Sequence, residues 1–205
     1  VLFTCMVGLI IAPNQVSYLN SVLSLIAVAL GAGAAGTLNM WYESDLDALM
    51  TRTCLRPIPT GQVTKNQALF FGVLLSIGSI SLLYFSSNLM SASLLLLTIC
   101  FYFFIYTVWL KRRTPQNIVI GGAAGALPPV IGWTIATGSL SVEPLILFLI
   151  IFLWTPSHFW ALSIYKSNDY KKAKIPMLPI IYGIDKTKKN IFTYSLLLLP
   201  TISAP

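Results

Sequence analysis

Three side chains around residue 43 have the types and the spacing of a metal-binding surface. Asn39, Glu43 and Asp47 follow one another at intervals of four residues, so on a helix they fall within about 80° of arc and form one polar stripe. Arg52 and Arg56 come shortly afterwards. Carboxylates suit a hard cation such as Mg²⁺, and arginine suits phosphate. The segment therefore predicts a cation bridged to a phosphate; the alternative is a helix end with a solvated mixture of charges.

A second polar group lies between residues 102 and 117. Tyr102 and Tyr106 share one helix face, and the basic residues Lys111, Arg112 and Arg113 follow them. Lys111 and Arg112 would complete a cage for a diphosphate. The alternative is that these charges only stop the transfer of the chain through a membrane.

A third group surrounds His158, the one histidine of the chain. If the helix continues through residue 169, His158 and Asp169 lie on one stripe, with Lys166 and Lys172 nearby. Asp169 would bind a second Mg²⁺ or orient a lysine. A single histidine near the end of a span is more often an interfacial residue, and aromatic residues such as Trp160 are common there. The spacing alone leaves both interpretations open.

The composition predicts an all-α integral membrane protein. Apolar residues make up 56% of the chain and charged residues 9%, whereas soluble proteins have roughly 25% charged residues. Hydropathy predicts five full spans and two partial spans in a polytopic transmembrane helical bundle. They are 1–12 (partial), 19–40, 68–87, 90–110, 116–137, 143–165 and 191–205 (partial). The first could also be a signal-peptide core, but it lacks a basic start and a cleavage site.

The charges lie on alternate connections between these spans. All thirteen Lys and Arg residues, and five of the six acids, belong to the second, fourth and sixth connections. Basic connections face the cytoplasm, or the matrix in a mitochondrion. Orientation explains the basic residues but gives no reason for the acids. We interpret the chain as one membrane domain, 1–205, incomplete at both ends, with active-site loops at about 41–67 and 166–190.

Small residues mark two of the spans. The sequence GAGAAG occupies residues 31–36, and GGAAGALPPVIGW occupies residues 121–133. Small side chains let helix backbones approach closely, and Pro128 and Pro129 predict a bend. The bend either serves tight packing or opens a cavity for a large apolar ligand. The three cysteines have neither metal-site nor disulfide spacing.

The three polar segments together resemble the UbiA-type membrane prenyltransferases and, within that family, the protoheme IX farnesyltransferases or heme O synthases. The resemblance rests on residues 39–63, 106–133 and 158–179 and extends over about residues 19–190. Its most specific parts are the pattern Met-x-Arg-Thr-x-x-Arg-Pro, which starts at Met50, and His-Phe-Trp-Ala-Leu, which starts at His158. Of the second acidic motif of the family, only Asp169 remains.

The resemblance implies a bundle of about nine spans and a Mg²⁺-dependent reaction. Farnesyl from farnesyl diphosphate would join a vinyl group of heme b, giving heme O for heme–copper terminal oxidases. The implied roles are as follows: catalytic, Asn39, Glu43 and Asp47; metal, Glu43, Asp47 and Asp169; diphosphate, Arg52, Arg56, Lys111, Arg112, Lys166 and Lys172; positioning of heme or another acceptor, His158, Tyr102, Tyr106 and Trp160.

The same resemblance sets the expected surroundings and the rival functions. It implies the bacterial plasma membrane or the mitochondrial inner membrane, with heme A synthase or oxidase assembly proteins as candidate partners and no nucleic acid. A rival prenyltransferase acting on a quinone precursor would be expected to have a fuller second acidic motif. A transporter would be expected to carry charges on both sides of the bilayer, whereas nearly all charge here lies on one side.

Overall fold

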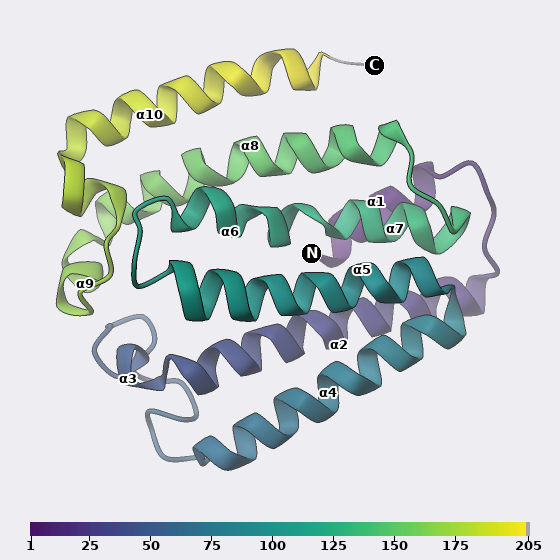
Figure 1. The fold of residues 1–205 in the computed structure, drawn as a ribbon, viewed down its shortest axis with the longest axis horizontal. Coiled ribbons are helices and arrows are strands. Elements are labelled where there is room, and N and C mark those ends of the chain that lie inside the picture. Colours follow the sequence, from purple (N-terminus) through teal and green to yellow (C-terminus); the bar gives the residue numbers. More distant parts are fainter. Residues whose placement is uncertain (204–205) are drawn as a thin grey trace.

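Residues 1–203 are described by the computed structural model, in which long helices lie side by side (Figure 1). Five helical segments are long and apolar enough to cross a membrane, as the hydropathy predicted. They are α2 (Tyr18–Tyr42), α4 (Lys65–Ser86), α5 (Leu89–Cys100) continued by η1 (Phe101–Leu110), the pair α6 (Asn117–Ala126) and α7 (Pro128–Thr137), and α8 (Val142–Tyr165). The other helices are α1 (Leu2–Ile11), α3 (Ser44–Asp47), α9 (Ser167–Lys172) and α10 (Leu178–Ile202).

Polar residues set the starts of several spans. The hydroxyl of Ser17 accepts from the third residue of α2, and the side chain of Asn88 does the same for α5. Thr64 and Gln67 form a reciprocal capping box at the start of α4. Such caps satisfy amide groups that lack a partner in the first helical turn. Gly138, with φ of 68°, ends α7 in the left-handed conformation that favours glycine.

Two interruptions shape the centre of the bundle. The span predicted at 116–137 is divided at Leu127, because Pro128 and Pro129 cannot continue α6. The predicted bend is therefore confirmed. The sequence did not predict that η1 would be a π-helix, in which the Lys111 amide donates to the Tyr106 carbonyl at 2.9 Å. Each π-helical turn holds extra residues, so it changes which side chains share a face.

The C-terminal helix is also bent. Gly183 has φ of 80° inside α10, so the helix axis changes direction before the second half of α10. The partial span predicted at 191–205 corresponds to that second half up to Ile202; residues 204 and 205 lie outside the described residues.

Close backbone contacts hold the helices together. α1 packs against α7, α2 against α4, and α8 against both α6 and α10. In the first pair, Gly8 lies directly on the carbonyl of Pro129, and Gly132 lies on the carbonyl of Cys5. No Cβ atom would fit at either glycine, so these positions bring the two helices into backbone contact.

The polar connections gather at one end of the bundle. The connection 43–64, the connection 111–116 and helix α9 all lie at the left in Figure 1. The helices therefore bring to one end the three polar groups that are far apart in the sequence.

Candidate functional site

A cavity of about 740 Å³ extends from this polar end into the helices. Its polar lining includes Asn39, Asp47, Arg52, Arg56 and Lys111. The body of the cavity is lined mainly by glycine, alanine and aliphatic residues of α2, α5, α6 and α8. The small residues seen in the sequence thus leave space as well as allowing helices to pack. A cavity with a charged end and a long apolar body suits an amphiphilic ligand.

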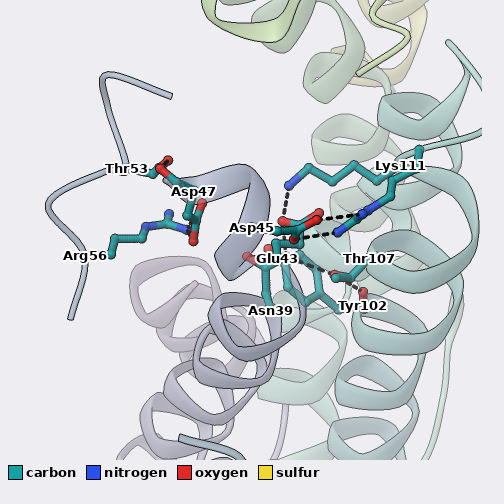
Figure 2. A network of polar contacts seen from close by, with 10 residues as sticks. Asn39, Glu43, Asp45, Asp47, Thr53, Arg56, Tyr102, Thr107 and Lys111 are labelled. Carbon is teal, nitrogen blue, oxygen red and sulfur yellow. Dashed lines mark hydrogen bonds and ion pairs between the residues drawn. The ribbon is translucent and has the colours of Figure 1, made fainter. Parts of the chain in front are cut away.

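Glu43 is the most buried acid of the site (Figure 2). Its side chain is 1% exposed, and its Oε2 atom accepts from Asn39 at 2.8 Å and from the Lys111 ammonium group. Asn39 also donates to the hydroxyl of Thr107 at 3.2 Å. The other oxygen, Oε1, has no partner in the described part of the chain although it is buried. Glu43 therefore keeps one oxygen available for a donor or a cation.

Asp47 lies on a different helix from Asn39 and has a different ion-pair partner from Glu43. Helix α2 ends at Tyr42, Glu43 leaves helical geometry, and Asp47 belongs to the short helix α3. One Arg56 nitrogen donates to both carboxylate oxygens of Asp47 at 2.9 and 2.8 Å. The expected contact between positions 39 and 43 is present, but the three residues do not form one continuous helical stripe.

Arg52 and two tyrosines complete the polar end. All three side chains line the cavity, and Arg52 makes no ion pair among residues 1–203. The rings of Tyr102 and Tyr106 are 5.3 Å apart, and the Lys111 nitrogen lies 5.8 Å from the centre of the Tyr106 ring. Arg52 is thus a cavity-lining, solvent-exposed cation that no acid neutralises among residues 1–203.

Five other residues predicted at the site do not line the cavity: Glu43, Arg112, Lys166, Lys172 and Trp160. Arg112 forms two hydrogen bonds with Asp45 at 3.1 and 3.0 Å. Partial burial raises the pKa of Asp45, but the hydrogen bond and charge of Arg112 outweigh it and hold that pKa below its ordinary value. Lys166 and Lys172 are exposed. Trp160 is buried and packs edge-on against Tyr194, with ring centres 5.3 Å apart.

His158 and Asp169 are separated by the end of α8. The helix stops at Tyr165, and Lys166 takes a non-helical conformation before α9, so the predicted stripe does not form. His158 lines the cavity and stacks on Trp154, with ring centres 4.4 Å apart and an interplanar angle of 15°. Asp169 is buried, does not line the cavity, and accepts from the hydroxyl of Thr51 at 2.5 Å.

Sequence reasoning assigned no role to Asn117 or Thr107, and it left Trp154 open as an interface aromatic or a wall around a planar or prenyl ligand. Asn117 is fully buried on the cavity wall, and its Oδ1 atom has no partner among the described residues. Its place four residues after Arg113, the last of the basic run, was the available signal. Thr107, on the π-helix η1, contacts Asn39, and no pattern in the sequence predicts a π-helix there. Trp154 lies one helical turn before His158, a spacing that predicts contact on a helix.

Comparison with known proteins places this geometry in a family. The model of the UbiA prenyltransferase family matches residues 1–205. The chain belongs to the UbiA prenyltransferase family. This UbiA prenyltransferase is 69% identical, over all of its 205 residues, to a protein of Pelagibacter ubique (strain HTCC1062) named protoheme IX farnesyltransferase, and it covers 68% of that relative. It is 56% identical over its full length to the protein of the same name from Ehrlichia ruminantium (strain Gardel), covering 70% of it.

Solved structures confirm the predicted fold. A UbiA homolog from Archaeoglobus fulgidus bound to DMAPP and Mg²⁺ superposes with a TM-score of 0.80 at 18% identity, over 98% of this UbiA prenyltransferase and 71% of the homolog. A digeranylgeranylglyceryl phosphate synthase superposes with a TM-score of 0.78 at 21% identity, over 98% and 70% of the two chains. The all-α membrane bundle of the UbiA type is therefore the fold of this chain.

Proposed function

We propose that this chain transfers the farnesyl group of farnesyl diphosphate to a vinyl group of heme b, with addition of water, to make heme O. The observation that carries the proposal is one cavity whose charged end continues into an apolar body large enough for a prenyl chain. Relatives named protoheme IX farnesyltransferase, at 69% and 56% identity, support heme as the acceptor.

The acids at the polar end fit a Mg²⁺ ion. Among the described residues Glu43 has a buried oxygen without a partner, and Asp47 is a buried carboxylate that lines the cavity. Among residues 1–203 no three His, Cys, Asp or Glu side chains converge on one point. Diphosphate oxygens and waters would therefore supply the remaining ligands, as is common for Mg²⁺. When bound, the ion would stabilise negative charge on the diphosphate.

The basic residues act on the leaving group. As the bond between the allylic carbon and the diphosphate oxygen breaks, negative charge grows on the diphosphate. Arg52 and Lys111 stabilise that charge, and an interaction that strengthens in the transition state raises the rate. Arg56 is held by Asp47, so it contributes to the same positive field from a fixed place. Asn39 keeps Glu43 oriented through its hydrogen bond.

The cavity walls act on the allylic cation and on the acceptor. Tyr102 and Tyr106 offer ring faces to the cation at the polar end, and the apolar body keeps water away until the new carbon–carbon bond forms. The stacked rings of Trp154 and His158 form a flat surface for a planar macrocycle. In this proposal His158 contacts the heme iron or a propionate. Trp160, also on α8, positions the helix by packing against Tyr194.

The remaining assignments are also proposals. We place the basic connections on the cytoplasmic side of a bacterial plasma membrane, because basic connections are retained on that side. Heme A synthase or oxidase assembly proteins are the expected partners, since heme O must pass to an oxidase. Direct diphosphate contacts by Arg112, Lys166 and Lys172 stay predictions, as does metal binding by Asp169; all four would require the side chains to move toward the cavity.

The test is heme analysis of membranes that contain the full-length protein. Heme b, farnesyl diphosphate and Mg²⁺ are supplied, and extracted hemes are identified by mass spectrometry. We expect heme O from the parent and from Asp185→Asn, whose carboxylate is exposed on α10, and no heme O from Asp47→Asn. Prenylation of a phenolic acceptor in place of heme would reassign the acceptor. Absence of any prenylated product would overturn the proposal.

A further inference from the structure

Two loops that are distant in sequence meet through a single polar contact. Thr51, in the connection after α3, donates its hydroxyl to the Oδ2 atom of Asp169 on α9, at 2.5 Å across 118 residues of sequence. Asp169 is 7% exposed. Within residues 1–203 it makes no ion pair. The partner of this buried carboxylate is therefore a neutral hydroxyl group.

An apolar cluster surrounds the contact and joins the same two loops. It contains residues from α3, the connection after it, the start of α6, α9 and the segment that follows α9: Leu46, Met50, Ile118, Tyr170, Ala173, Ile175 and Met177. Several of them, including Met50 and Tyr170, also line the cavity. The cluster is thus both the join between the loops and part of the cavity wall.

We propose that Thr51 and Asp169 are positioning residues for Arg52. Arg52 directly follows Thr51 and is the cavity-lining cation that no acid neutralises among the described residues. The connection 48–64 contains no helix, so the backbone around Arg52 depends on contacts of this kind. With the hydrogen bond in place, the guanidinium group stays on the cavity wall, ready to bind diphosphate. The inference rests on the proposed function and deepens it.

This role differs from direct metal binding by Asp169 in what substitutions do. An amide at position 169 still offers a carbonyl oxygen to Thr51, so Asp169→Asn keeps the positioning contact, whereas Asp169→Ala removes it. Thr51→Ser keeps the donor, and Thr51→Val removes it with little change in shape. A metal ligand would respond in the opposite way: Asp169→Asn would weaken Mg²⁺ binding, and Thr51→Val would leave it unchanged.

The experiment uses the full-length protein in lipid nanodiscs. Hydrogen exchange of residues 48–56 and 167–173 is measured without substrate, and the Kd for farnesyl diphosphate is measured by calorimetry over a range of Mg²⁺ concentrations. Thr51→Val and Asp169→Ala are expected to exchange about tenfold faster in both segments and to bind farnesyl diphosphate about five- to tenfold more weakly, as for loss of one hydrogen bond. Their Mg²⁺ dependence is expected to stay unchanged.

Three further variants complete the set. Thr51→Ser is expected to behave like the parent. Asp169→Asn is expected to keep the parent's exchange rates in both segments, because its carbonyl oxygen still accepts from Thr51; its Mg²⁺ dependence then shows whether Asp169 also binds metal. Thr193→Val is the matched control, because its hydroxyl is exposed on α10 and bonds only within that helix. The inference would be overturned, and Asp169 would be a metal ligand, under two conditions together. Thr51→Val would show the exchange rates and the Kd of the parent, and Asp169→Asn would show a shifted Mg²⁺ dependence of farnesyl diphosphate binding. Faster exchange with unchanged Kd would overturn it in favour of a purely structural contact.

The outcome is separable from that of the proposed function. A parent protein that binds farnesyl diphosphate but makes no heme O would refute the acceptor and leave the positioning test readable. A parent that does not bind farnesyl diphosphate at all would overturn both.

Discussion

The two acidic regions of the polar end differ in the groups that contact their buried carboxylates. In the first, Glu43 contacts Lys111 and Asp47 contacts Arg56. In the second, Asp169 contacts the hydroxyl of Thr51. Acids paired with cations can exchange those partners for Mg²⁺ and diphosphate without leaving a charge unmatched, whereas an acid held by a hydroxyl ties two loops together. The partner of each carboxylate separates these roles, and the residue type does not.

The largest expected effect is loss of the buried acid in the first region. Glu43→Gln should lower heme O formation by about 10²-fold or more, because the substitution removes a carboxylate that would hold the Mg²⁺ ion, and that ion would stabilise the negative charge on the diphosphate. Asp169→Asn should lower it by less than about threefold, because the hydrogen bond to Thr51 survives. Rates of heme O formation by the two variants and by Asp185→Asn give the comparison. Equal losses at positions 43 and 169 would erase the distinction between the two regions.

Removal of the cation beside Glu43 should affect stability as well as activity. Lys111→Met leaves the Glu43 carboxylate buried without its ion-pair partner, which typically costs about 3–5 kcal/mol. The thermal unfolding temperature in detergent should fall. Adding Glu43→Gln to Lys111→Met should restore much of that loss, because the unpaired charge is gone. A double variant less stable than Lys111→Met would show that Lys111 contributes through packing instead.

Arginine substitutions test which cations face the cavity. Arg52→Ala should weaken farnesyl diphosphate binding about tenfold, since a charge-assisted contact to phosphate is lost. Arg113→Ala serves as the control, because Arg113 is exposed and does not line the cavity. The Kd values for farnesyl diphosphate from calorimetry check the prediction. Similar Kd values for both variants would contradict diphosphate binding by Arg52.

The polar end opens into an apolar body, which can be narrowed without a backbone clash. Gly125 lines the cavity, and nothing lies within 4 Å of a Cβ atom built there. Gly125→Leu should raise the KM for farnesyl diphosphate about fivefold, because the added side chain takes space from the prenyl group. Gly78→Leu is matched to it, since Gly78 on α4 is equally open but lies outside the cavity. Equal KM values would place the prenyl group elsewhere.

The smallest effect is expected from the exposed pair between Asp45 and Arg112. Because the pKa of Asp45 is held below its ordinary value of 3.8, the pair stabilises the protein above that pH and loses its effect as the pH falls through the lowered pKa. Asp45→Asn should cost at most about 0.5 kcal/mol at pH 7, since exposed pairs contribute little, and nothing in strong acid. Unfolding temperatures measured from pH 7 to about pH 1 would reveal a larger role if the difference persisted at the lowest pH.

The sequence predicted those features that depend on local pattern. Continuous apolar runs gave the five spans, Pro128 and Pro129 gave the break between α6 and α7, and the interval of four residues gave the contact between Asn39 and Glu43. Each follows from helix geometry and needs no knowledge of the rest of the chain.

The features that were not predicted depend on tertiary contacts. No glycine or proline lies between Tyr42 and Asp47 to signal the end of α2, and the turn at Lys166 that separates His158 from Asp169 is equally unmarked. The contact of Thr51 with Asp169 joins segments that only the finished bundle brings together. Long-range packing can end a helix that local propensity would continue, and this decides which acids face the cavity.

The contact of α1 with α7 sets an order in time for the assembly of the bundle. Gly8 fits only against the backbone of Pro129, which is synthesised ~120 residues later, on the order of ten seconds at ordinary rates of translation. During that interval α1 is already in or near the membrane while the surface that will receive it does not yet exist. A larger side chain at Gly8 should therefore act during biogenesis, lowering the yield of inserted protein, whereas molecules that do assemble should bind farnesyl diphosphate normally.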